Sequence, residues 1–319
     1  MNPEVSVLMP SFNAGKFLKI AVESILNQTY GDFELIIIDD GSTDNSIDEL
    51  LGIQDARIRL IRNRQNLGLI AARNMAVNLA QAPLLACLDA DDVAMPKRLE
   101  LQVEAFRTNP NLTLLGSAAY LIDSRGEVFD VIDVPTADSE IRREILRGNK
   151  IIHSSVMMRA SVVKPLGGYP VEYSLAEDYA LWVRIIPTHT VGNLQERLVQ
   201  YRVHEGQVSQ TKIEDMRQMT AKIQLHTWET LRSSGQSEGV SPPLVPTLLS
   251  KLRGDVGSFG RDCLYWARLY RRMGSWPNTL KFLTMGLLSA PLCSALYSVL
   301  LPPRLLARLR PQRGQRTRL

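Results

Sequence analysis

Residues 4–44, "EVSVLMPSFNAGKFLKIAVESILNQTYGDFELIIIDDGSTD", place one amphipathic stretch between two apolar runs. The second run is apolar on successive residues, as expected for a strand whose two faces are both covered in a parallel sheet. Apolar side chains in the middle stretch recur at the spacing of one helix face, at Phe17, Leu18, Ala21, Ile25 and Leu26. A strand, a helix and a second strand in this order predict a parallel α/β sheet.

The same alternation continues to about residue 92. We expect strands in "RIRLIRN" (57–63) and "PLLACLDADD" (83–92), and helices in "NSIDELLGI" (45–53) and "LIAARNMAVNLAQ" (69–81). Ligands of such sheets bind beyond the carboxyl ends of the strands. The segments "MPSFN", "IDDGSTD" and "LDADD" all lie at those ends, so we look for a site there.

The pattern after residue 110 is less regular. It predicts strands in "LTLLGSAAYLID" and "VFDVIDVP", helices in "SEIRREILRG" and "LAEDYALWVRII", and a strand, a short helix and a Gly-Gly turn in "SSVMMRASVVKPLGGYP". From about residue 211 the pattern is helical. We therefore divide the chain into 1–110, 111–210 and a C-terminal helical extension, 211–319.

Composition and charge exclude several classes of protein. The 319 residues carry a formal charge of +4, but six arginines lie after residue 303 and no acid accompanies them. The basic balance therefore belongs to a tail, and we expect no nucleic-acid-binding core. The three cysteines form no CxxC pair, which argues against a disulfide framework and a zinc site. The N-terminus has no basic region before its first strand, so we expect no signal peptide and a cytoplasmic protein.

Three aspartates, Asp89, Asp91 and Asp92, follow the predicted buried strand at 83–88. Carboxylates this close repel one another, and a bound cation would remove that cost. Hard oxygen ligands suit Mg²⁺ or Mn²⁺, which also bind diphosphate oxygens. The alternative is a solvated turn, which is what most D-x-D sequences form.

Other polar residues lie at the neighbouring strand and helix ends. Asp40 is placed to hydrogen bond a ligand's base or ribose, whereas Ser42 or Asp44 would cap the next helix. Arg73, followed by Asn74, could pair with a diphosphate or a uracil edge, or lie solvated on its helix.

Two acids, Glu177 and Asp178, lie at the predicted start of a helix. Acids there commonly favour the helix dipole. Alternatively, one of them is a general base over a substrate hydroxyl. A single histidine, His204, follows a strand pattern and is either structural or part of a site.

Taken together, these segments resemble the family 2 glycosyltransferases, which have a GT-A fold with a Rossmann-like, mostly parallel sheet flanked by helices. The matching pieces follow the family's order over about residues 4–210: residues 5–44, "NLGLIAARNMAV", "LDADD", "GGY", "AEDYALWVRI" and "YRVHEGQVS". The resemblance implies inverting transfer of a sugar from a nucleotide-diphosphate donor. We expect this donor to be a UDP-sugar. Residues 1–110 then form the half that binds the nucleotide sugar, and 111–210 the half that binds the acceptor.

The resemblance also assigns roles to single residues. The nucleotide site would consist of Pro10, Phe12, Asp40, Arg73, Asn74 and Asp89. The ligands of Mn²⁺ or Mg²⁺ would come from Asp89, Asp91, Asp92 and His204. Asp178 becomes the catalytic base, with Glu177 the next candidate, and His153 would border the acceptor cleft.

The mechanism implied is one in-line displacement. The cation neutralises the leaving diphosphate, while the base takes the proton of the attacking acceptor hydroxyl. The acceptor would be a glycan or a lipid-linked glycan of a cell-surface polysaccharide. No Q-x-x-R-W segment of the processive synthases is present in the sequence, which favours addition of a single sugar.

Competing readings predict features that the sequence lacks. A nicotinamide dehydrogenase should carry G-x-G-x-x-G after its first strand, and "PSFNAG" differs from it. A nucleotidyltransferase should carry a Gly-rich basic loop there. A non-catalytic nucleotide-sugar-binding scaffold on the same fold remains the alternative, and it predicts loss of the carboxylates Asp89, Asp91 and Asp178.

The C-terminal part bears on whether the protein contacts a membrane. Residues 282–303 carry no charge and are long enough to span a bilayer, but Gly286, Pro291 and several Ser/Thr interrupt them. We favour a helical hairpin. The arginine-rich tail that follows would then hold the protein at an anionic cytoplasmic membrane face, or would remain a solubilising tail.

Overall fold

The computed structural model describes residues 2–205, 207 and 212–240. The chain divides into two compact units, Met1–Val245 and Pro246–Leu319, and the first contains all of these residues. Residues 282–303 and the arginine tail therefore lie outside the described residues. Within the described part, no helix combines the length and the apolar character needed to cross a membrane. The predicted boundaries at 110 and 210 stay predictions.

One nine-stranded sheet organises the described residues. Its strands are β1 (Val5–Ser11), β2 (Phe33–Asp39), β3 (Ile58–Arg62), β4 (Leu84–Cys87), β5 (Val93–Ala94), β6 (Leu112–Ile122), β7 (Val128–Ile132), β8 (Met157–Arg159) and β9 (Thr190–Arg202). The order is β3-β2-β1-β4-β8-β6-β9-β5, with β7 paired to β6. The first four strands are mutually parallel, as predicted. β8 is antiparallel to β4 and β6, whereas β9 is parallel to β6.

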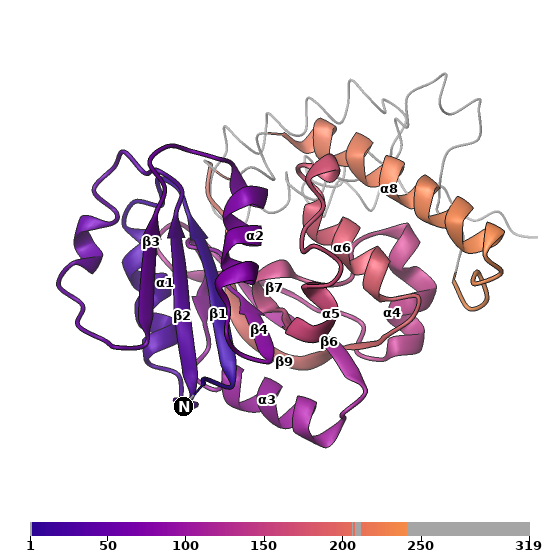
Figure 1. The fold of residues 1–319 in the computed structure, drawn as a ribbon, viewed down its shortest axis with the longest axis horizontal. Helices are drawn as coiled ribbons and strands as arrows, with labels where there is room; N and C mark the ends of the chain where they lie inside the picture. Colours follow the sequence, from indigo (N-terminus) through magenta and orange to yellow (C-terminus); the bar gives the residue numbers. More distant parts are fainter. Residues whose placement is uncertain (1, 206, 208–211, 241–319) are drawn as a thin grey trace, which may run out of the picture. The chain divides into compact units, whose positions relative to one another are not determined.

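Helices cover both faces of this sheet (Figure 1). They are α1 (Phe17–Leu26), α2 (Leu69–Leu79), α3 (Arg98–Thr108), α4 (Asp138–Glu144), α5 (Ala160–Val163), α6 (Glu177–Ile185) and α8 (Ile213–Ser233). Short 3₁₀ turns are η1 (Asp48–Leu50), η2 (Ile145–Arg147), η3 (His153–Ser155) and η4 (Val171–Tyr173). The α/β class with a mostly parallel sheet is confirmed, and α8 supplies a helix after residue 211.

The alternating side chains of the central strands build two separate cores. Because successive residues of a strand point to opposite faces, Leu8 of β1 packs in the core that contains α2 and α6, and Val7 and Met9 pack in the core that contains α1 and α3. The same split runs through β2, where Ile36 and Ile37 belong to different cores. Burial on both faces explains the continuous apolar runs of the sequence.

Three elements differ from the sequence-based expectation. The helix predicted at 45–53 is only the single turn η1, and Asp44 accepts hydrogen bonds from Ser46 and from the backbone N–H of Gly15. The helix α3 was not predicted, since its buried face includes two polar side chains, Arg98 and Gln102. A bulge in β9 breaks the alternation that would have marked this strand.

The register of the parallel strands fixes the position of the polar loops. Ser11 pairs with Asp39, and Leu8 pairs with Cys87, so β1, β2 and β4 end at the same edge of the sheet. The chain continues from β1 to β2 on one side of β1, whereas β4 lies on its other side. This edge is therefore the topological switch point of the sheet. The loops after these three strands therefore come together, as the sequence predicted.

The Gly-Gly turn at Gly167 and Gly168 ties α2 to the segment before α6. Both glycines have left-handed backbone angles, with φ of 80° and 74°. Asn74 of α2 hydrogen bonds both backbone groups of Tyr169: its amide nitrogen donates to the carbonyl at 2.8 Å, and its oxygen accepts from the N–H at 2.7 Å. A Cβ on Gly168 would lie 2.3 Å from that oxygen, whereas one on Gly167 meets open space.

This difference predicts two unequal costs in one turn. We expect Gly167→Ala to lower the free energy of unfolding by about 1–2 kcal/mol, the cost of a left-handed alanine. Gly168→Ala should cost about 1–3 kcal/mol more, because Asn74 must also give up two hydrogen bonds. Urea unfolding of both variants measures the difference. Equal costs would show that the Asn74 contact contributes nothing.

Candidate active site

The three aspartates after β4 have three different environments. Asp89 accepts hydrogen bonds from Arg73 Nη2 at 2.9 Å and from Ser154 Oγ at 3.1 Å, and its Oδ2 lies 3.3 Å from His153 Nδ1. Burial alone would raise the pKa of the Asp89 carboxyl, but the charges of Arg73 and His153 outweigh burial and hold the pKa well below its usual range. Asp89 is therefore an ionised carboxylate with both oxygens engaged.

Asp92 faces the protein interior. Only 1% of its surface is exposed, and its Oδ1 accepts the backbone N–H of Arg202 at 2.7 Å. Burial, together with the charges of Asp91 and Asp89, raises the pKa of the Asp92 carboxyl well above its ordinary value. Asp92 thus anchors the loop to β9.

Asp91 faces a histidine. Its Oδ2 lies 3.0 Å from His204 Nε2, and about a quarter of each side chain is exposed. Arg202, two residues before the histidine, donates from Nε to the backbone carbonyl of Asp91 at 2.7 Å and so fixes the two segments together. The His204 ring also packs against Phe17, with ring centroids 5.3 Å apart.

A partly exposed carboxylate beside an imidazole fits a divalent cation that takes most of its ligands from water and substrate phosphates. Among the described residues, no group of three or more carboxylate, imidazole or thiol side chains could hold a metal by itself. The Asp91–His204 pair therefore fits a cation shared with a nucleotide diphosphate better than a resident metal enclosed by protein.

Arg73 joins the aspartate loop to the start of α6. Its guanidinium is buried, with Nη2 on Asp89 and Nη1 donating to Glu177 at 2.5 Å. Burial alone would lower the pKa of Arg73, but the charges of Asp89 and Glu177 raise it. The ion pair explains how Glu177 remains buried, with only 5% of its surface exposed. Arg73 thus holds Glu177, the residue beside Asp178, in a fixed position.

We therefore predict that Glu177 stabilises the folded protein through its ion pair with Arg73. Breaking a buried ion pair on one side costs about 3–5 kcal/mol, so Glu177→Gln should lower the free energy of unfolding by at least about 3 kcal/mol. Asp178→Asn, one residue further on, should change it little because that side chain is partly exposed. Urea unfolding followed by circular dichroism compares the two. A Glu177→Gln chain as stable as the native one would contradict the assignment.

Asp178 lies at the first turn of α6 and points out of the core. Its Oδ2 accepts a hydrogen bond from Asn149 Nδ2 at 3.2 Å, and its Oδ1 accepts the N–H of Tyr179 at 2.6 Å. Unlike Glu177, it forms no ion pair with a described residue. Of the two acids, Asp178 is therefore the one that is partly exposed and outside the ion pair with Arg73.

The predicted nucleoside residues lie at the ends of β1 and β2. Pro10 is buried within β1, whereas the Phe12 side chain just beyond the strand is 47% exposed, unusual for a large apolar group. Asp40 is buried, and its oxygens accept hydrogen bonds from Asn63 Nδ2 and from the backbone N–H groups of Leu67 and Gly68. Asp40 thus shapes the loop before α2, and its contact with a base stays a prediction.

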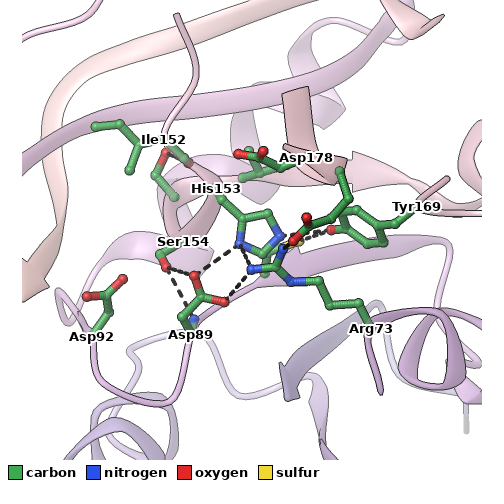
Figure 2. A network of polar contacts seen from close by, with 12 residues as sticks. Arg73, Asp89, Asp92, Ile152, His153, Ser154, Tyr169 and Asp178 are labelled. Carbon is green, nitrogen blue, oxygen red and sulfur yellow. Dashed lines mark hydrogen bonds and ion pairs between the residues drawn. The ribbon is translucent and has the colours of Figure 1, made fainter. Parts of the chain in front are cut away.

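Figure 2 shows Asp89, His153 and Arg73 joined in one network, with Tyr169 at one end and Asp92 apart from it. His153 Nε2 lies 3.0 Å from the Tyr169 hydroxyl, which in turn lies 3.3 Å from Cys87 Sγ. His153 was expected only to border the acceptor cleft, and neither the contact of Ser154 with Asp89 nor that of Tyr169 with His153 was predicted. A lone histidine before a buried strand carries no spacing signal that could have revealed this contact.

Comparison with known proteins decides the family. Residues 6–164 match the family described as "Glycosyl transferase family 2". Over 207 residues, 63% of this chain and 71% of the relative, the sequence is 36% identical to an uncharacterized glycosyltransferase of Methanocaldococcus jannaschii. The chain belongs to glycosyltransferase family 2. This glycosyltransferase is also 32% identical, over 66% of its length and 82% of the relative, to the UDP-Glc:alpha-D-GlcNAc-diphosphoundecaprenol beta-1,3-glucosyltransferase WfaP of Escherichia coli.

A solved structure agrees with the fold of the glycosyltransferase. S. aureus TarS, residues 1–349 in complex with UDP-GlcNAc, superimposes with a TM-score of 0.58 over 88% of this chain and 90% of that one. The sequences are 17% identical, so this likeness concerns the fold alone. It supports the GT-A arrangement expected from the sequence.

Proposed function

We propose that the enzyme transfers a single sugar from a UDP-sugar to a hydroxyl of a lipid-linked glycan, with inversion, in the synthesis of a cell-surface polysaccharide. The observation that carries the proposal is the arrangement around Arg73. This one side chain contacts Asp89 on the donor side and Glu177 beside Asp178. A rigid link between a donor loop and a base is what a single displacement requires, because reacting groups must be held in line.

The donor assignment rests on the sheet edge and on relatives. Phe12 offers an exposed aromatic face at the end of β1, next to the loops after β2 and β4. WfaP is named for a UDP-glucose donor, and the TarS complex contains UDP-GlcNAc. Both names support a uridine nucleotide over other donors.

The proposed cation is Mn²⁺ or Mg²⁺, and Asp91 and His204 would hold it. Asp89 and Asp92 would instead support the loop, since the first is engaged by Arg73 and Ser154 and the second is buried. When bound, the cation supplies positive charge that stabilises the departing diphosphate.

Asp178 would act as the general base. Its partly exposed carboxylate accepts the proton of the acceptor hydroxyl as that oxygen attacks the anomeric carbon. Asn149 holds one carboxylate oxygen and leaves room for a second hydrogen bond to it. A lipid-linked acceptor is supported by WfaP, whose name specifies a GlcNAc-diphosphoundecaprenol acceptor.

A donor screen tests the proposal. Thermal shift and donor hydrolysis would be measured with UDP-, dTDP- and GDP-sugars, each with Mn²⁺, Mg²⁺ or EDTA. The proposal expects stabilisation and slow hydrolysis with a UDP-sugar and cation. Binding of a UDP-sugar with no hydrolysis and no transfer under any condition would instead favour a non-catalytic scaffold.

A further inference from the structure

The described residues form a polar cavity that is open to solvent and lies away from the aspartate loop. Its volume is about 680 Å³, and it lies between α4, the loop after β7 and the middle of β6 and β9. Sites for small ligands typically measure about 300–1,000 Å³. The polar side chains that line it include Asp133, Thr136, Glu140, Lys150, Gln195 and Arg197.

Several of these side chains have no side-chain partner among the described residues. Glu140, Lys150 and Gln195 form no side-chain hydrogen bond or ion pair with any described residue, yet they come from three separate segments. Arg197 Nε is buried and likewise lacks a partner in the described part, although Nη2 binds Asp133 at 2.6 Å. A buried donor such as Arg197 Nε indicates a place that water or a polar ligand completes, and the exposed side chains of Glu140 and Gln195 are accessible to the same ligand.

The walls of the cavity are held by the backbone. The side-chain amide of Asn193 donates to the carbonyls of Pro135 at 2.7 Å and Lys150 at 3.1 Å, so it fixes two walls to β9. Next to it, Leu194 pairs with Ser117 and Arg197 with Ala118, which leaves Gln195 and Glu196 as a bulge. Bulges redirect side chains and are frequent beside active sites, and this one presents Gln195 to the cavity.

Two consecutive residues connect the cavity to the proposed base. Asn149, which donates to Asp178 Oδ2, immediately precedes Lys150 of the cavity wall. Because Asn149 and Lys150 are consecutive, the Lys150 end of the cavity lies next to the segment that contacts Asp178.

The charges of the lining select the class of ligand. Three carboxylates, those of Asp133, Glu140 and Glu144, face only two cations, Lys150 and Arg197. This balance disfavours a diphosphate. It suits an uncharged ligand with many hydroxyls, which can donate to carboxylates and accept from an ammonium or an amide. On the basis of the proposed function, we infer that the cavity binds a sugar unit of the acceptor glycan, behind the unit that carries the reacting hydroxyl.

The test uses the full chain and simple sugars as probes. Methyl α-glycosides of N-acetylglucosamine, galactose and glucose would be titrated in turn into ¹⁵N-labelled protein. We expect at least one to bind with a dissociation constant of about 1–10 mM, as suits so small a ligand, and to shift the amide signals of Lys150 and Gln195.

A matched pair of variants separates this site from general surface binding. The double variant Glu140→Ala, Lys150→Ala should weaken binding at least about tenfold, because a ligand loses a hydrogen bond to each of two charged groups. Lys19→Ala, an exposed lysine on α1, should leave it unchanged. Because the side chains of Glu140 and Lys150 have no partner in the described part of the chain, the double variant should keep its melting temperature.

Binding of UDP with Mn²⁺ would be measured on the same samples. Nucleotide binding without any glycoside-induced shift at the cavity overturns this inference and leaves the proposed function standing. Shifts at the cavity that the double variant does not weaken also overturn it. Glycoside binding at the cavity without nucleotide binding supports a sugar site but contradicts the UDP donor.

Discussion

Asp178→Asn is expected to reduce the rate of sugar transfer by about 10²–10⁴, the usual contribution of a general base. Asparagine keeps the shape of the side chain but cannot take a proton. An asparagine at 178 can still accept the N–H of Tyr179, so at most one partly exposed hydrogen bond is lost: that with Asn149, or that of Asn149 with the N–H of Ile151. The fold and the donor site should therefore remain intact.

The measurement is the rate of transfer at saturating donor, with the affinity for UDP and Mn²⁺ determined in parallel. Loss of rate with unchanged nucleotide affinity is the expected result. Asn149→Ala serves as the matched control, because it removes the same hydrogen bond from Asp178 and leaves the carboxylate in place. Transfer at the native rate in the Asp178→Asn chain would remove Asp178 from the mechanism, and Glu177 would then be tested despite its burial.

The difference between Glu177 and Asp178 shows what cannot be predicted from the sequence alone. The order of elements up to residue 92, and the common edge of β1, β2 and β4, followed from apolar periodicity alone. Periodicity also placed Glu177 and Asp178 at the start of a helix, but it cannot say which of them is buried. That depends on Arg73, 104 residues away from Glu177 along the chain.

The environments of the aspartates in the loop after β4 likewise depend on segments that are distant in the sequence. The sequence indicated that Asp89, Asp91 and Asp92 belong to a site, because a buried strand ended in three carboxylates. Their separate environments depend on His153, Ser154 and Arg202, which arrive from η3 and β9. These partners have no fixed spacing from the loop, so no local pattern could assign them. Asn74, predicted at the nucleotide, similarly turned out to hydrogen bond the backbone of Tyr169.

Asp91→Asn is expected to abolish the part of nucleotide binding that depends on a cation. Loss of residues that merely support a metal ligand typically lowers metal affinity about 10–100-fold, so loss of the ligand itself should lower it by at least about 100-fold. Calorimetry of UDP binding with Mn²⁺ measures the effect, and the same titration in EDTA gives the cation-independent part, which should not change. His204→Ala should act in the same direction, because its Nε2 lies 3.0 Å from the Asp91 carboxylate.

Asp92→Asn is the matched control, since it replaces another carboxyl group of the same loop by an amide. Burial and the two neighbouring carboxylates disfavour a charge on Asp92 and raise its pKa, and the asparagine oxygen can still accept the N–H of Arg202. We therefore expect native stability and native Mn²⁺-dependent binding in Asp92→Asn. Equal weakening of binding in Asp91→Asn and Asp92→Asn would contradict the placement of the cation at Asp91. A selective loss in Asp91→Asn locates the cation at the carboxylate that faces His204.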